Sequence, residues 1–190
     1  MGIIYFMKHA IVICILLMPT ISHAQHNPMF ANHTRNSIGI YAAQSTGHGD
    51  LGHLIGPWEW DFTPMTLVMF QYSQPLTFLR LPGRINIHAL QNFAYRGARG
   101  ASFGAMGISL DVLLASWCGF YFGVGMGPYM RDSGDDYVDS RLVFGERVFI
   151  GKQITPRLHT EIFTLHFSNG DFTDPNHGFN FAGLGINVSF

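Results

Sequence analysis

Charged residues are scarce in this chain, and neither sign of charge dominates. Only 12% of its 190 residues are charged, with 11 Lys and Arg against 12 Asp and Glu. An ordinary soluble domain carries roughly twice that share, so we expect part of the surface to face something other than water. The lack of a basic excess argues against a nucleic-acid partner. A disordered chain is excluded as well, because 47% of the residues are hydrophobic and 14% are aromatic.

Cysteine is nearly absent, since the sequence holds only Cys14 and Cys118. Two cysteines cannot form the disulfide framework of a small secreted domain, and we expect Cys118 to pack as a small apolar group. The ten histidines are scattered and show no metal-ligand spacing. The sequence therefore predicts neither a metal nor a cofactor.

The first residues have the pattern of a secretory signal peptide. Lys8 precedes the apolar run 10–18, Pro19 ends that run, and Ser22-His23-Ala24 forms a small-x-small cleavage site. The run is too short to be a spanning helix, which needs about 20 residues. We expect a signal peptide over residues 1–24, with a short N-terminal anchor as the alternative, and one domain over residues 25–190.

Alternation with period two dominates the rest of the chain, and no helical period extends over several turns. Over 104–112, 119–130 and 182–190, large apolar residues occupy one face and small or weakly polar residues the other. A soluble sandwich would place many Lys and Glu on its polar face. Small residues suit the crowded interior of a narrow barrel whose large residues face lipid. The apolar alternation that ends on Phe190 also resembles the terminal strand of bacterial outer-membrane barrels.

These patterns predict an all-β fold, an eight-stranded antiparallel transmembrane β-barrel. The residues after Ala24 suffice for about eight strands at some 20 residues each. The predicted strands lie near 36–46, 62–74, 84–96, 101–113, 118–130, 140–150, 157–169 and 180–190, and the stretches 65–71 and 79–84 are hard to assign. Loops are expected at 47–61 and 131–139. Trp58, Trp60 and Trp117 fit either interfacial aromatic girdles or packing in the interior.

A histidine and a serine stand two residues apart in the seventh predicted strand. Glu161 and its charged same-face neighbours belong in the lumen, so His166 and Ser168 are expected to face lipid near the outer rim. Neighbouring side chains on one face of a strand lie roughly 6.5–7 Å apart, a gap that rotamer choice can close. Such a pair can act as general base and nucleophile. Taken alone, however, a His-x-Ser pattern is usually structural.

Three further residues complete this predicted site. An antiparallel hairpin can bring Asn180 beside His166, where the amide oxygen would fix the imidazole tautomer, although it supplies no charge. Asn169 is a candidate oxyanion donor through its side-chain amide, together with the backbone N–H of Gly170. Ile162 and Leu184 lie beside the site and could line a groove there, although ordinary bilayer contact is the simpler explanation for each.

The segment HFSNGDFTDPNHGFN, residues 166–180, resembles the signature of the PagL family, the lipid A 3-O-deacylases. That signature is H-x-S-N, then a short loop, then P-N-x-G followed by an acidic position. The matching residues are His166, Ser168, Asn169, Pro175, Asn176 and Gly178. The signal peptide, the barrel pattern and the chain length agree with the family as well.

The resemblance implies an eight-stranded barrel of the bacterial outer membrane, a serine hydrolase that removes the 3-O-linked acyl chain of lipid A. Its substrate would be lipopolysaccharide, its surroundings outer-membrane lipids, and it would need no cofactor. Ser168 would be the nucleophile, His166 the general base and Asn169 the oxyanion residue. The glutamate of the family's catalytic triad falls on Asn180, which is a departure from the pattern.

This departure leaves alternatives open. Asn180 could orient His166 unaided, Asp171 or Asp174 from the loop could contribute, or activity could be lost. The competing functions are a non-catalytic small barrel with a structural or adhesive role and an esterase acting on phospholipid. The sequence leaves a homodimer open.

Overall fold

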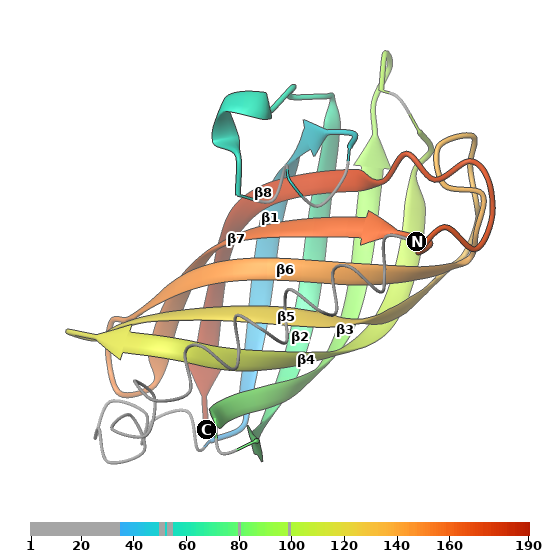
Figure 1. The fold of residues 1–190 in the computed structure, drawn as a ribbon. Helices are drawn as coiled ribbons and strands as arrows, with labels where there is room; N and C mark the ends of the chain where they lie inside the picture. Colours follow the sequence, from blue (N-terminus) through green and yellow to red (C-terminus); the bar gives the residue numbers. More distant parts are fainter. Residues whose placement is uncertain (1–34, 50–51, 53–54, 80, 99) are drawn as a thin grey trace.

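The structure is a computed structural model, and it describes residues 35–49, 52, 55–79, 81–98 and 100–190. Eight antiparallel strands form a closed barrel in which each strand pairs with the next and β8 pairs with β1 (Figure 1). The strands are β1 (Ser37–Gly47), β2 (Met65–Phe78), β3 (Leu81–Ala94), β4 (Phe103–Trp117), β5 (Phe120–Arg131), β6 (Leu142–Gln153), β7 (Leu158–Ser168) and β8 (Phe179–Ser189). The predicted fold class is confirmed, whereas the predicted signal peptide lies outside the described residues.

The predicted strands and the observed strands differ mainly around the hairpin of β2 and β3. β2 ends at Phe78 and β3 begins at Leu81, so most of the stretch 79–84 belongs to β3. Leu79 adopts a positive φ of 48°, which allows the tight reversal there. Residues 65–71, hard to assign from the sequence, lie within β2. Within the predicted loop 47–61, residues Pro57–Glu59 form the short 3-10 helix η4.

The two ends of the barrel differ in the length of their connections. Short turns at 79–80, 118–119 and 154–157 lie at the end where β8 finishes, which we call the short-turn end. Longer connections at 48–64, 95–102, 132–141 and 169–178 lie at the other end, the long-loop end (Figure 1). Among the described residues, no helix is long and apolar enough to cross a membrane.

Side chains alternate between the lumen and the outer wall, as the sequence predicts. On β5, Tyr121 and Tyr129 are buried in the lumen, whereas Phe120 and Met126 are exposed. Many other apolar side chains are exposed on the strands, among them Ile38, Ile40, Phe70, Ile85, Ile87, Met106, Ile108, Ile150, Ile162, Leu184, Ile186 and Val188. Such an apolar wall is costly in water and favourable in lipid.

Glycines on the lumen face leave room for aromatic rings from neighbouring strands. A Cβ added to Gly185 would collide with the ring of Tyr41, and one added to Gly151 would collide with the ring of Tyr121. Gly107 is covered in the same way by Tyr129. The small residues on the lumen face therefore leave the space that the large rings occupy in the interior.

A buried network of charged and polar groups crosses the lumen and is centred on Glu161. Oε1 of Glu161 accepts from Arg84 Nη1 at 2.7 Å and from the Tyr121 hydroxyl at 2.8 Å. Its Oε2 accepts from Arg147 Nη2 at 2.7 Å and from the Tyr41 hydroxyl at 2.8 Å. Arg84 Nε also donates to Asp111 at 2.8 Å. Two guanidinium groups thus face two carboxylates in the interior, and the predicted lumen position of Glu161 is confirmed.

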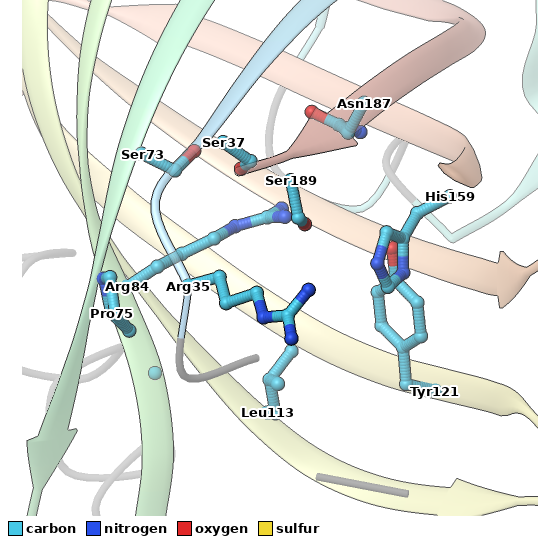
Figure 2. A pocket seen from close by; sticks show the side chains of 11 residues that line it. Arg35, Ser37, Ser73, Pro75, Arg84, Leu113, Tyr121, His159, Asn187 and Ser189 are labelled. Atoms are coloured by element: carbon cyan, nitrogen blue, oxygen red, sulfur yellow. The ribbon is translucent and has the colours of Figure 1, made fainter. Parts of the chain in front are cut away.

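The interior leaves little free space. A cavity of about 20 Å³ lies near the short-turn end, lined by residues that include Ser37, Ser189 and Arg84. Figure 2 shows Arg84, Tyr121, His159 and Asn187 around this cavity. A volume of this size is close to that of one water molecule.

Two expectations about single side chains need correction. Cys118 does not pack as an apolar core residue, because it lies exposed in the turn between β4 and β5 with a φ of 49°. Trp58 and Trp117 are 81% and 76% exposed, at opposite ends of the barrel, so neither packs in the interior. Their role in aromatic girdles stays a prediction.

We expect Glu161→Ala to destabilise the folded barrel strongly. The substitution leaves Arg84 and Arg147 buried without their main counter-charge, a loss that typically costs about 3–5 kcal/mol. Urea unfolding of the barrel in phospholipid vesicles, followed by tryptophan fluorescence, measures the change. Glu59→Gln in the exposed η4 helix is the control and should unfold like the wild type; equal midpoints for Glu161→Ala would contradict the assigned role.

Candidate functional site

His166, Ser168 and Asn180 project from the same outer face of the barrel at its long-loop end. His166 and Ser168 alternate in phase with the exposed Ile162, and His166 is paired directly with Asn180 across β7 and β8. Asn180 lies in phase with the exposed Leu184. The predicted position of Asn180 beside His166 is therefore confirmed, and the hydrogen bond between Ser168 and His166 stays a prediction.

The imidazole of His166 is held by Asn180. Nδ1 of His166 lies 2.8 Å from Oδ1 of Asn180, and Nδ2 of Asn180 donates to the carbonyl of Gly49 at 3.4 Å. An amide oxygen only accepts, so Nδ1 carries a proton, and in the neutral imidazole Nε2 then keeps its lone pair. A neutral imidazole in this tautomer is the form that can take a proton from a neighbouring hydroxyl.

Loops cover His166 and Asn180 although both lie on the outer face. Their side chains are only 3% and 1% exposed, whereas Ser168 is half-buried. Gly178 approaches Cε1 of His166 so closely that an added Cβ would lie 2.6 Å from it. The carbonyl of Gly178 lies 3.0 Å from Nδ1 of His48. Of these three side chains, Ser168 is therefore the most exposed.

The pairing of β1 with β8 is irregular beside this site. The register shifts between Ser45 and Gly47, and Gly47 is then paired with Asn180. A bulge of this kind bends the strand locally and turns the following residues in a new direction. It places Gly49 where its N–H donates to the carbonyl of His177 at 3.0 Å, so the first loop is joined to the last loop above His166.

The loop after Ser168 is organised by Asn169. Its buried side-chain amide donates to the carbonyl and the hydroxyl of Thr173 at 2.7 and 2.8 Å, and its Oδ1 accepts from the backbone N–H of Asp171 at 2.9 Å. Both amide hydrogens are thus used inside the loop. The oxyanion role of Asn169 stays a prediction, and it requires Thr173 to release the amide.

Gly170 and Asp171 both have a positive φ, of 66° and 61°. This conformation suits glycine and turns the chain sharply after Asn169, next to the nucleophile candidate. The carboxylate of Asp171 accepts from Asn176 Nδ2 at 2.7 Å, so it serves the loop. Asp174 precedes Pro175 in the same exposed loop.

A carboxylate that the sequence did not single out lies on the other side of His166. Glu146 of β6 is paired directly with His166 and shares its outer face. The alternation of residues 142–153 shows that Glu146 faces outward, but only the pairing of β6 with β7 reveals its neighbour. In the part of the chain that the structure describes, no group of His, Cys, Asp and Glu side chains could hold a metal ion.

Comparisons with known proteins give one family and, separately, one fold. A family model described as "Lipid A 3-O-deacylase (PagL)" matches residues 53–189. The crystal structure of the outer membrane enzyme PagL is 13% identical, with a TM-score of 0.57, and covers 81% of this chain and 99% of its own. The crystal structure of Neisserial surface protein A is 10% identical, with a TM-score of 0.57, and covers 82% and 97%. No curated protein matches the chain in sequence.

We expect Gly178→Ala to displace the ring of His166 while the barrel stays folded. The new Cβ would lie 2.6 Å from Cε1 of His166 and 2.7 Å from the Gly49 carbonyl, at a φ of 68°. In a histidine-labelled barrel, the protected Nδ1–H signal of His166 should then be lost from the NMR spectrum. Gly97→Ala is the matched control, because Gly97 also has a positive φ but nothing within 4 Å of an added Cβ; loss of the signal there too would refute the contact argument.

Proposed function

This chain belongs to the lipid A 3-O-deacylase (PagL) family, and from that premise we propose that it is a serine esterase of the bacterial outer membrane that removes the 3-O-linked acyl chain of lipid A. The observation that carries the proposal is the outward position of His166, Ser168 and Asn180 on a wall of apolar side chains. The same three side chains in a lumen would meet no lipid. Their place on the wall supports a substrate that is itself part of the bilayer.

The proposed orientation follows from the connections between strands. In outer-membrane barrels the short turns face the periplasm and the longer loops face the outside. The long-loop end, which contains the site, would then lie at the level of the outer leaflet. Near the interface a polar group on the lipid face costs only about 0–1 kcal/mol, so the position is tolerable.

The proposed chemistry is acyl transfer through Ser168. Nε2 of His166 takes the hydroxyl proton while Oγ of Ser168 bonds to the ester carbonyl carbon. The backbone N–H of Gly170 is our candidate to hold the oxyanion, with Asn169 shaping the loop around it. Collapse breaks the bond to the sugar oxygen, which receives the proton from His166. Water, deprotonated by His166, then releases the fatty acid and restores Ser168.

Apolar side chains next to the site offer a surface for the acyl chain that is transferred to Ser168. Ile162 and Leu184 are directly paired across β7 and β8, and both are 64% exposed. They continue the line of His166 and Asn180 along the outer wall. An acyl chain lying against them would keep its contacts with the bilayer while its ester group reaches Ser168.

Ser168→Ala and His166→Asn should each abolish the loss of one acyl chain from lipid A. The first variant removes the nucleophile and the second removes the base, so both remove the covalent step. Mass spectrometry of lipid A from expressing cells measures the outcome. Thr160→Val, on the same face of β7 but at its short-turn end, should leave the wild-type spectrum unchanged. Identical spectra for wild type and Ser168→Ala would reject the esterase and favour a non-catalytic barrel, and phospholipid loss with intact lipid A would favour a phospholipid esterase.

Asn180→Leu should lower kcat by about 100-fold in purified barrel. Leucine keeps the volume but offers no acceptor for Nδ1–H, so the productive tautomer of His166 is no longer fixed. Initial rates on detergent-dispersed lipid A at saturating substrate give kcat directly. An unchanged kcat would mean that the 2.8 Å contact between Asn180 and His166 has no part in the reaction.

A further inference from the structure

Glu146 and Asn180 flank His166 on three adjacent strands. In the register of β6 with β7, Glu146 is opposite His166, and in the register of β7 with β8, His166 is opposite Asn180. Directly opposed residues have Cβ atoms about 4.5–5.5 Å apart, within reach of a glutamate side chain. His166 is thus paired with an amide residue on one neighbouring strand and with a carboxylate residue on the other.

The surroundings of Glu146 are otherwise apolar. Met126 is its partner on β5, and Phe144 and Val148 are its same-face neighbours on β6. Its side chain is half-buried, and Oε2 is buried with no hydrogen-bond partner among the described residues. A buried carboxylate oxygen without a hydrogen-bond donor is costly, so packing alone does not account for a glutamate at this position.

Asn180 can perform only one of the two tasks of the acid in a catalytic triad. It fixes the tautomer of His166 through Oδ1, but a neutral amide cannot offset the charge of the imidazolium that forms when Ser168 loses its proton. A carboxylate on the neighbouring strand can, since electrostatic attraction is strong where water is scarce. The loop aspartate Asp171 is engaged with Asn176 at 2.7 Å, which makes it a weaker candidate for this task.

We propose that Glu146 supplies the negative charge beside His166 that the Asn180 amide lacks, so that the two residues together do the work of one triad acid. The proposal rests on the proposed function of Ser168 and His166. Glu146 acts through His166 and does not touch the reacting atoms, so it is a positioning residue. Its effect is confined to the step in which His166 becomes charged.

The test is a cycle of variants at residues 146 and 180, assayed on purified, folded barrel with detergent-dispersed lipid A. Glu146→Gln should lower kcat by about 100-fold with little change in KM, because charge stabilisation is lost and substrate contacts are kept. Glu146→Asp keeps the charge and should retain at least about tenfold more activity than Glu146→Gln. Lys152→Gln, on the same face of β6 at the short-turn end, should keep wild-type kcat.

The second part of the test uses Asn180→Glu to place a carboxylate on the other side of His166. Asn180→Glu should restore most of the lost kcat in the Glu146→Gln background, and its gain in the wild-type background should be much smaller. Such non-additivity is expected when two positions supply one function. The electrophoretic shift of unheated barrel confirms that each variant is folded.

Three results would overturn the proposal. The first is wild-type kcat in Glu146→Gln, the second is a change in KM alone, and the third is failure of Asn180→Glu to rescue Glu146→Gln. Each can occur while Ser168→Ala is inactive, in which case the esterase stands and only the role of Glu146 falls. Full activity of Ser168→Ala would reject the esterase and this role together.

Discussion

The interior network around Glu161 is the constraint on which the rest of the molecule depends. It joins Arg84 of β3, Arg147 of β6 and two tyrosine hydroxyls to one carboxylate, and Tyr41 extends it to Asn187 of β8 at 2.9 Å. A closed barrel satisfies the backbone hydrogen bonds of its strands. The lumen-facing side chains of the eight strands must also fill the interior, and their charges must be paired. These side chains occupy the lumen face of the strands, whereas His166, Ser168 and Asn180 lie on the outer wall.

The outer wall imposes its own conditions on a site. Polar side chains there are tolerable only near an end of the barrel, and they need cover. His166 and Asn180 meet both conditions, because they lie at the long-loop end beneath Gly178 and Gly49. The sheet provides the geometry without extra structure: a hairpin register brings together two residues fourteen positions apart. Rigid strands therefore position His166, and no loop is needed to bring it beside Asn180.

Much of this arrangement could be predicted from the sequence, because alternation with period two carries the information. It fixes which residues face the lumen, hence the outward position of His166, Ser168 and Asn180. Loop conformations and the register of β6 with β7 were not predictable in this way. The engagement of Asn169 by Thr173 and the exposure of Cys118 depend on loop conformation. The position of Glu146 beside His166 depends on the register of β6 with β7, which no local pattern specifies.

The departure at position 180 is best understood through this same register. Each residue on a barrel wall has two lateral neighbours, one on each adjacent strand, and both lie at comparable distances. A role that needs charge near an imidazole can therefore be met from either side of it. Replacing a carboxylate by an amide at Asn180 keeps the hydrogen-bond acceptor and removes the charge, while Glu146 lies at the opposite neighbour position. Division of one role between β6 and β8 would require no change in the fold, since the sheet already pairs both residues with His166.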